Sequence, residues 1–323
     1  MSAGPDISIS LVNTGNRELL LDCLRSLDVA ARDVRLQTIV VDNASTDGSA
    51  EAVEAEFPGV EVVRRDRRHG FGANHNEGIR RSRGRYVLIL NEDTVLHDGM
   101  LDALCRFMDE NPEIGAAGPR ILYPDGAVQP SAFRFPTPAR VALTTLTLQR
   151  AFWDQSDTER IARVDWVSGA AIFARRAALE AIGGFDEQLF IYSEDPDLCL
   201  RLRDAGYATA FFPHASLVHF ENATTSGVPE RRIYQMERSR ALYSRKHHGI
   251  AGEIAVRGLT AAAFAARAGV AKALLTVPGG RRLKPLDPSA PAQFLAHTKA
   301  ALKPNARPGI EEAAADFNAQ QPT

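Results

Sequence analysis

The first part of the chain alternates short apolar runs, rich in β-branched residues, with segments of helical period. The apolar runs cover residues 7–12, 36–42, 60–64 and 86–91. The segment between the first two runs carries leucine at positions 20, 24 and 27, which share one helical face. Strands that alternate with helices indicate a mostly parallel, Rossmann-like sheet flanked by helices. The predicted fold class is therefore α/β.

Polar residues follow three of these runs, at the point where each predicted strand ends. They are the segment Asn13–Asn16, the pair Asp42–Asn43 and the segment Asn91–Asp93. Ligands of parallel α/β sheets bind beyond the carboxyl ends of the strands, where these segments should meet. Carboxylate oxygens after the fourth run suit a hard divalent ion on a diphosphate, and Asp42 suits a ribose hydroxyl or a base amide. For each segment alone, an ordinary polar turn is the alternative.

A further acidic segment, LFIYSEDPDLCLRLR, begins at Leu189 and places Glu194, Asp195 and Asp197 at the start of a predicted helix. The mutual repulsion of three acids is eased by the positive end of a helix dipole, and further by a cation or a proton. The segment is therefore typical of a catalytic base or of a site for a metal-bound substrate. An acidic first turn with Ser193 as N-cap is the alternative, and the segment alone does not decide between them.

Three other features carry expectations of their own. Asp197 lies four residues before Arg201, so we expect these two side chains to pair. Trp166 is either a core aromatic or a platform for a sugar face. The run Gly70-Phe71-Gly72 resembles a dinucleotide fingerprint, but His75 stands where its third glycine belongs, which argues against a Rossmann dehydrogenase. His75 receives no role.

Composition excludes several classes of protein. The 323 residues carry a formal net charge of -2 and are 45% hydrophobic, which is ample for a core. This charge, together with the lack of a basic stripe with interleaved aromatics, argues against general attraction to nucleic acid. Cys23, Cys105 and Cys199 are widely spaced within apolar helical patterns, which predicts buried reduced thiols and no zinc site. The N-terminal residues do not have the pattern of a signal peptide.

The chain divides into a predicted catalytic domain, residues 1–249, and an extension, residues 250–323. The extension shifts to Ala, Arg and Pro, which predicts a helical part to about Val277 and then a poorly ordered Pro-rich tail. Arg267 and Lys272 interrupt its longest apolar stretch, which argues against a membrane span. The segment 140–165 shows no clear period and is predicted to be a mobile excursion.

Five segments in order resemble the family 2 glycosyltransferases with the GT-A fold. They are VVDNASTDGS, HGFGANHNEGI, LNEDT, the long segment from SGAAIFARR to LRDAGY, and a later histidine, His219. The resemblance runs from about Ile7 to about Gly249. It is closest to bacterial rhamnosyltransferase-like members, judging from DGAVQPSAFRFPTP and DWVSGAAIF.

The resemblance implies an inverting transfer of a sugar from a nucleoside diphosphate sugar to an acceptor hydroxyl. It implies that Asp42 contacts the nucleoside and that Asp93 holds a Mg2+ or Mn2+ ion on the diphosphate. His219 would be a further ligand of the metal or of the diphosphate. Asp195 would be the general base, an assignment favoured over Glu194, which would bind acceptor hydroxyls.

The amides of Asn13, Asn74 and Asn91, and the ring of Trp166, complete the predicted substrate contacts. Asn91 stands where the family often has an acid, which predicts weak or water-rich metal binding. Thr14 stands where an aromatic is frequent, which puts stacking of a uracil or thymine ring in doubt.

Two other functions stay open at this point. A nucleotidyltransferase usually has a glycine-rich, basic loop after its first strand, and NTGNRE has one Gly and one Arg. A non-catalytic nucleotide-sugar-binding protein would not need the acidic residues. The expected partners are a dTDP- or UDP-linked donor and a glycan or polyprenyl-linked acceptor, in the cytoplasm and without nucleic acid. The basic, Ala-rich C-terminal region either contacts the inner face of the cell membrane or packs on the catalytic domain.

Overall fold

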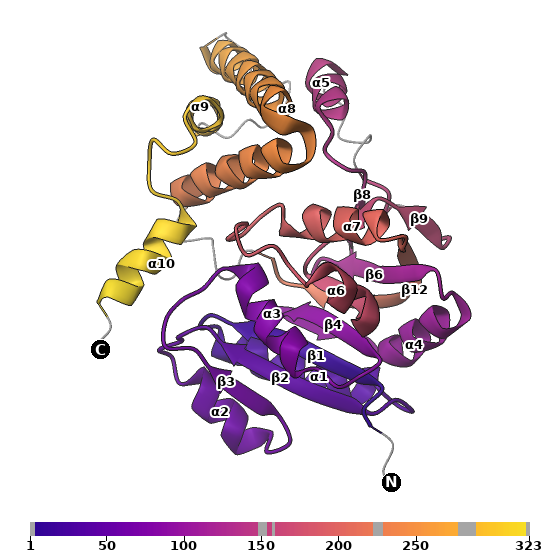
Figure 1. Ribbon diagram of the computed structural model, residues 1–323. Helices are drawn as coiled ribbons and strands as arrows, with labels where there is room; N and C mark the ends of the chain where they lie inside the picture. The colour runs from indigo at the N-terminus through magenta and orange to yellow at the C-terminus, as the bar shows by residue number, and fades with distance from the viewer. Residues whose placement is uncertain (1–3, 148–153, 157–158, 222–228, 277–288, 321–323) are drawn as a thin grey trace.

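The computed structural model describes residues 4–147, 154–156, 159–221, 229–276 and 289–320. Its centre is a ten-stranded sheet covered by helices (Figure 1). The strands are β1 (Ile7–Asn13), β2 (Leu36–Asp42), β3 (Glu61–Arg64), β4 (Tyr86–Asn91), β5 (Thr94–Leu96), β6 (Ile114–Leu122), β7 (Val128–Gln129), β8 (Ala132–Phe133), β9 (Ala162–Val164), β10 (Trp166–Val167), β11 (Ala171–Arg175) and β12 (Ala208–His219). The four predicted N-terminal strands are confirmed.

The helices of the N-terminal part are α1 (Arg17–Ala30), α2 (Ser49–Glu56), α3 (Phe71–Arg81), α4 (Met100–Glu110), α5 (Pro138–Thr147), α6 (Arg176–Ile182) and α7 (Glu194–Asp204). The C-terminal part contains α8 (Pro229–Thr276), α9 (Ala290–Leu302) and α10 (Ile310–Ala319). The predicted α/β class with a helical C-terminal extension is confirmed.

The sheet runs in the order β3-β2-β1-β4-β11-β6-β12-β5, with β7 beside β6 and β9 beside β12. The first four strands are parallel, and β6 is parallel to β12. Strand β11 lies antiparallel between β4 and β6. Strands β8 and β10 form a separate two-stranded sheet.

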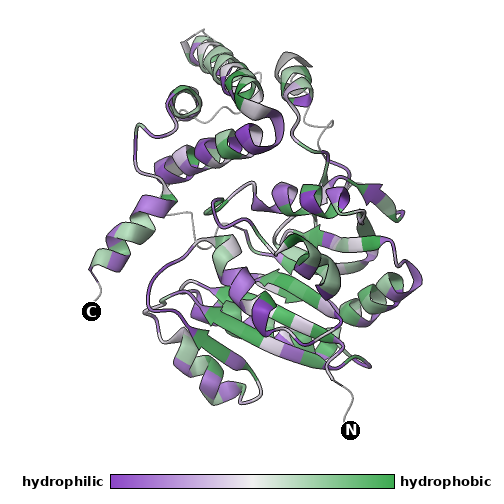
Figure 2. Cartoon of the chain, viewed as in Figure 1, coloured by the Kyte–Doolittle hydropathy of each residue, from purple (hydrophilic) through white to green (hydrophobic). Residues whose placement is uncertain are grey.

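Two hydrophobic cores lie on opposite faces of the sheet, because successive side chains of a strand point to opposite sides. On β4, Leu88 and Leu90 pack in the core with α1 and α4, whereas Val87 and Ile89 pack in the core with α6 and α7. A parallel strand buried on both faces is apolar throughout, as YVLIL is. The central strands are accordingly largely green, that is hydrophobic, in Figure 2.

The C-terminal helices lie over the carboxyl-end side of the sheet (Figure 1). Helix α8 is interrupted at Gly249, whose φ of 67° is non-helical, so the helix changes direction at the predicted domain boundary. The boundary itself stays a prediction. The described part of the tail differs from the poorly ordered segment predicted, since residues 290–302 and 310–319 are helical. Residues 277–288 lie outside the described residues.

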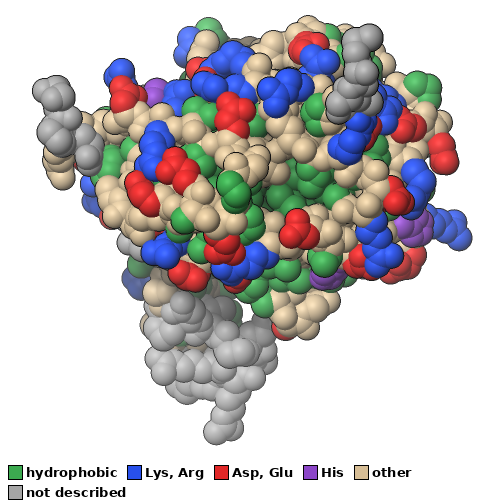
Figure 3. Space-filling view, turned by 90° about the horizontal axis from the view of Figure 1, so that it is seen from below, with side chains coloured by type: hydrophobic (Ala, Val, Ile, Leu, Met, Phe, Trp, Pro, Cys, Tyr) green, Lys and Arg blue, Asp and Glu red, His purple; other side chains and the backbone are tan. Residues whose placement is uncertain are grey.

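The three cysteines are buried and free, as predicted. The segment 140–165 contains part of α5 and strand β9, while its residues 148–153 and 157–158 lie outside the described residues. Acidic and basic side chains are interspersed on the face seen in Figure 3.

One helix among the described residues, α8 from Glu230, is long and apolar enough to cross a membrane by length and composition alone. Packed helices of soluble proteins also meet this criterion.

Candidate active site

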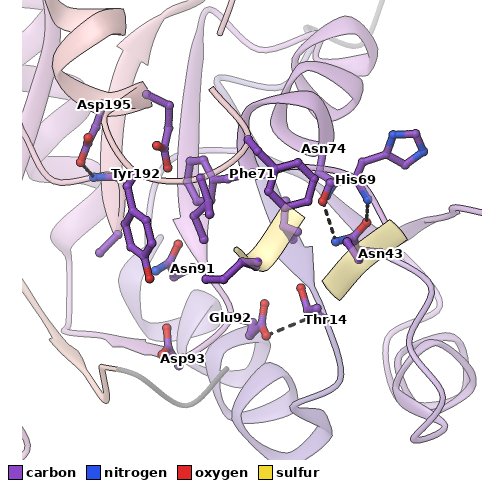
Figure 4. A pocket seen from close by; sticks show the side chains of 18 of the residues that line it. Thr14, Asn43, His69, Phe71, Asn74, Asn91, Glu92, Asp93, Tyr192 and Asp195 are labelled. Carbon is purple, nitrogen blue, oxygen red and sulfur yellow. Dashed lines mark hydrogen bonds between the residues drawn. The ribbon is translucent and has the colours of Figure 1, made fainter. Parts of the chain in front are cut away.

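A cavity of about 520 Å³ lies beyond the carboxyl ends of β1, β2 and β4. Six of the residues predicted from the sequence line it: Asn74, Asn91, Asp93, Glu194, Asp195 and His219. Figure 4 shows the side chains of Asn91 and Asp93 on one side of Tyr192 and that of Asp195 on the other. The structure thus brings the two predicted acidic segments, about a hundred residues apart in sequence, to one cavity.

Glycine allows the segment before α7 to approach α3. A Cβ atom at Gly70 would lie 2.4 Å from the carbonyl oxygen of Phe190, and the Phe71 N–H donates to that same oxygen at 2.7 Å. Gly70, the first glycine of the run that resembled a dinucleotide fingerprint, therefore serves close backbone packing, which sets the start of α7 beside the cavity.

Backbone hydrogen bonds tie Asp195 to the end of β4. The Gly169 N–H donates to Oδ2 of Asp195 at 3.2 Å, and the Asn91 N–H donates to the Ala170 carbonyl at 3.1 Å. The segment 168–170 therefore connects the acid of α7 to the strand that carries the Asn91–Asp93 segment.

The chain is strained immediately before the acids. Tyr192 and Ser193 have φ values of 70° and 68°, in the left-handed region that non-glycine residues seldom occupy. Ser193 stands at the N-cap position of α7 with the acids in the first turn, as the alternative expected, but its side chain makes no capping hydrogen bond. Strain of this kind, roughly 1–3 kcal/mol per residue, clusters at functional sites.

The three acids of α7 differ in the direction or size of their pKa shifts. Burial, opposed in part by the Gly169 N–H, raises the pKa of Asp195 to about 6. Burial and the charge of Asp195 raise the pKa of Glu194 well above its usual value, and Oε2 of Glu194 has no hydrogen-bond partner. Burial therefore makes both groups weaker acids, and Asp195, with a pKa of about 6, is ionised at neutral pH.

Asp197 has a structural environment. Its carboxylate is fully buried and forms an ion pair with Arg201 at 2.8 Å, which confirms the predicted pair. Lys246 and His247 contact the same carboxylate at 2.7 Å each. Burial alone would raise the pKa of Asp197, but the hydrogen bonds from His247 and Lys246 and the charge of Arg201 lower it to about 2.

Strand pairing brings His219 to Asp93. Strands β5 and β12 are antiparallel with Thr94 opposite His219, so Nε2 of His219 lies 3.2 Å from Oδ1 of Asp93. Nδ1 of His219 lies 3.0 Å from Oε1 of Gln129, an oxygen that only accepts, so Nδ1 carries the proton. Nε2 of His219 therefore faces the carboxylate of Asp93, and a proton or a cation between these two atoms satisfies both.

These two side chains suit a divalent ion, although they are few. Among the described residues no group of three or more His, Cys, Asp or Glu could hold a metal ion. Mg2+ commonly takes one or two carboxylates from the protein and its remaining ligands from substrate phosphates and water. The amide of Asn91 lies 3.4 Å from Nε2 of His219 and adds no charge.

Asp42, predicted to contact the nucleoside, and its neighbour Asn13 do not line the cavity, unlike the first two acids of α7. Asn13 donates to Oδ1 of Asp42 at 2.7 Å, and both side chains are buried outside the cavity lining. Asn43, the next residue, does line the cavity. Its side chain accepts from the His69 N–H at 2.7 Å and donates to the His69 carbonyl at 3.1 Å.

Trp166 and His75 lie apart from this cavity. The Trp166 ring stacks on Phe133 with centroids 4.4 Å apart, and its Nε1–H donates to the Arg134 carbonyl at 3.0 Å. The geometry corresponds to the packing alternative for this residue. His75 is buried against Ser10, and burial lowers its pKa to about 3, so it stays neutral.

Several lining residues had no assigned role from the sequence: Arg68, His69, Glu92, Tyr192, Arg232, Ile310, Ala313 and Ala314. Glu92 lies in the segment already singled out, where it accepts from Asn16 at 2.8 Å and from the Thr14 N–H at 3.4 Å. The residues of α10 carried no sequence signal, because only the folded chain brings them there.

A mixed sheet of this order, with acidic residues beyond its parallel strands, is the architecture of GT-A glycosyltransferases, to which solved structures similar to this one belong. The chain belongs to the glycosyltransferase like family 2, whose model matches residues 5–240. It is a glycosyltransferase close to rhamnosyltransferases.

Two curated relatives have rhamnosyltransferase names. N-acetylglucosaminyl-diphospho-decaprenol L-rhamnosyltransferase of Mycobacterium tuberculosis is 29% identical over 246 residues, 70% of this chain and 79% of the relative. Rhamnosyltransferase WbbL of Escherichia coli is 25% identical over 236 residues, 66% of this chain and 83% of the relative.

Two solved structures share the fold. The mannosyltransferase PcManGT of Pyrobaculum calidifontis, in complex with GDP-Man and Mn2+, has a TM-score of 0.56 at 18% identity and covers 99% of this chain and 88% of its own. TarS 1-349 of S. aureus, in complex with UDP, has a TM-score of 0.51 at 17% identity and covers 92% of this chain and 90% of its own.

Proposed function

We propose that the protein is an inverting glycosyltransferase that moves a sugar, rhamnose or another hexose, from a dTDP- or UDP-linked donor to a hydroxyl group. The observation that carries this proposal is the position of the Glu194–Asp195 pair and the Asp93–His219 pair in the lining of one cavity. In-line displacement at a sugar carbon needs a base on one face and a sink for charge on the other.

Asp195 is the base in this proposal. With a pKa of about 6 it is ionised at neutral pH yet basic enough to accept the proton of a hydroxyl as the hydroxyl attacks. Glu194 is assigned the contact with the acceptor, and burial and the charge of Asp195 raise its pKa well above its usual value. Its unpartnered Oε2 is then available to an acceptor hydroxyl.

Asp93 and His219 would hold a Mg2+ or Mn2+ ion, which supplies positive charge to the leaving diphosphate. Gln129 orients the imidazole for this, since it fixes the proton on Nδ1. A neighbour of the same fold was crystallised with GDP-Man and Mn2+, which supports a divalent ion in sites of this kind.

The donor nucleoside is assigned to the side of the cavity with Asn43 and His69, next to the Asn13–Asp42 pair. The acceptor is assigned to the side with the acids of α7 and is a glycan or a polyprenyl-linked glycan. The name of the mycobacterial relative, which specifies a diphospho-decaprenol acceptor, supports this class. Such an acceptor would place the enzyme in the cytoplasm, in contact with the inner face of the membrane.

A donor-hydrolysis screen tests this function. The protein is incubated with UDP-, dTDP- and GDP-sugars, with Mg2+, Mn2+ or chelator, and release of nucleoside diphosphate is measured. We expect release from one donor class and only with a divalent ion. Release of pyrophosphate from a nucleoside triphosphate would indicate a nucleotidyltransferase instead, and donor binding without hydrolysis or transfer would indicate a binding protein.

A further inference from the structure

The C-terminal helix α10 forms part of the cavity although it is remote in sequence from the rest of the lining. Ile310, Ala313 and Ala314 lie in that lining. In Figure 1 the helix lies beside the loop between β3 and α3 and below α8. The family model ends at residue 240, so this wall is outside the part of the chain that the family defines.

Both ends of α10 are fastened. At its start, Arg238 of α8 contacts Glu312 at 2.6 Å and Gln235 accepts from the Glu311 N–H at 3.2 Å. At its end, Asn318 accepts from the Arg68 N–H at 2.6 Å and donates to the Arg68 carbonyl at 3.0 Å. The helix therefore bridges α8 and the loop before α3.

The loop to which α10 is attached also forms the side of the cavity that is assigned to the donor. Asn43, at the end of β2, makes the same reciprocal pair of hydrogen bonds with His69 that Asn318 makes with Arg68. Two asparagine side chains, one from the sheet and one from α10, thus hold consecutive residues of one loop. The position of α10 is tied in this way to the strand end that carries Asp42 and Asn43.

Arg68 provides a charge on this wall. Its guanidinium lies over the Phe317 ring, 3.8 Å from the ring centroid. It has no carboxylate partner among the described residues, its Nε is buried without a hydrogen-bond partner, and burial lowers its pKa. A half-buried guanidinium that lines a cavity without an acid is suited to an anionic ligand.

We propose that α10 is the donor-side wall of the active site, with Ala313 and Ala314 setting the space for the nucleoside and Arg68 facing the anionic nucleotide. The proposal rests on the proposed function, because it assigns one wall of the same cavity. Alanine leaves room that a longer side chain would fill, so these positions determine which nucleoside fits.

The test compares Ala313→Leu with Ala315→Leu in the full-length protein. Ala315 lies on the same helix but is exposed, so both changes add the same side chain to α10 and one of them narrows the cavity. Binding of UDP and dTDP with Mn2+ is measured by calorimetry, and KM and kcat with the donor that the screen identifies. We expect Ala313→Leu to weaken nucleotide binding roughly tenfold through KM, with kcat little changed, and Ala315→Leu to match the unchanged protein.

Asn318→Ala is the second variant, because it releases the end of α10 without adding bulk, and it should also weaken nucleotide binding. Equal affinities for the two leucine variants, or equal losses in both, would overturn the role of α10 and leave the proposed function intact. If the unchanged protein binds no nucleoside diphosphate, the proposed function itself fails.

Discussion

Glu194 and Asp195 are adjacent, and burial raises the pKa of both side chains, to about 6 for Asp195. Replacement of Glu194 by Gln keeps a neutral hydrogen-bonding group of similar shape, so we expect kcat to fall by less than about tenfold, well under the effect of removing a base. The pH profile should follow Asp195, since a base must be deprotonated: kcat/KM should fall as the pH drops through about 6. A greater loss in Glu194→Gln than in Asp195→Asn would exchange the two roles.

At the proposed metal site, Gln129 should affect the affinity for Mn2+ although it is not a metal ligand. Replacement of Gln129 by Leu removes the acceptor that holds the proton on Nδ1 of His219, so we expect Mn2+ affinity to fall roughly 10–100-fold. His219→Ala should lower the Mn2+ affinity at least as much. The control is His97→Ala, an exposed histidine whose Nδ1 pairs with Ser216.

The measurement is Mn2+ binding in the presence of nucleoside diphosphate, followed by electron paramagnetic resonance. Unchanged affinity in both the Gln129 and His219 variants would exclude this ion site.

At the scale of elements, α7 and α8 are joined through Asp197, two residues after the proposed base. Lys246 and His247 of α8 both reach its buried carboxylate. Asp197→Asn leaves these cations without their partner, and we expect the free energy of unfolding to fall by about 3 kcal/mol. Asp204→Asn, at the exposed end of the same helix, should change it by less than about 0.5 kcal/mol. Urea denaturation measures both.

The pH dependence of this contribution has a definite sign. The pKa of Asp197 is lowered from 3.8 to about 2, so its stabilisation is present above pH 3.8 and is lost as the pH falls toward 2. The free energy of unfolding of the Asp197→Asn variant should not show this decrease between pH 3.8 and 2. Equal stability of this variant and the native protein at neutral pH would contradict a role for Asp197 in joining the helices.

The elements that could be predicted are those with a local signal. Strands β1, β2 and β4 end where the apolar runs end or one residue later, and the polar residues at these ends line or adjoin the cavity. The antiparallel insertion of β11 between β4 and β6 has no such signal, because strand order depends on pairing between distant segments. The same holds for the meeting of Asp93 with His219, which the register of β5 on β12 determines.

At the scale of the whole molecule, the C-terminal helices expose large apolar side chains. Ile250, Ile254 and Val270 of α8 are each at least 60% exposed. Several basic residues of the region are engaged internally, since Lys246 pairs with Asp186 and Asp197, and Arg257 pairs with Glu253. Membrane contact, where it occurs, should therefore depend more on apolar insertion than the sequence alone suggested.

Cosedimentation with vesicles that contain phosphatidylglycerol tests this contact. Ile254→Glu should reduce the bound fraction several-fold, because a carboxylate resists transfer into the interface and is repelled by anionic lipid. Val29→Glu is the control, since Val29 is similarly exposed but on α1. Full recovery of the native protein in the soluble fraction at low salt would count against membrane docking.

The arrangement of the cavity could be predicted in part. The family resemblance predicted one site for Asp93, His219, Glu194 and Asp195, and all four side chains line the same cavity. Arg68 and the alanines of α10 could not be found in this way, since no local pattern marks a helix that lines a site formed by distant segments of the chain.

The most direct test of the central claim is the turnover of Asp195→Asn beside Asp204→Asn, with the donor and metal that the screen identifies. Removal of a general base should lower kcat roughly 10²–10⁴-fold. Binding of nucleoside diphosphate with Mn2+ should persist, because Asp195 lies on the acceptor side, and Asp204→Asn should turn over like the native enzyme. Full turnover by Asp195→Asn would contradict the account.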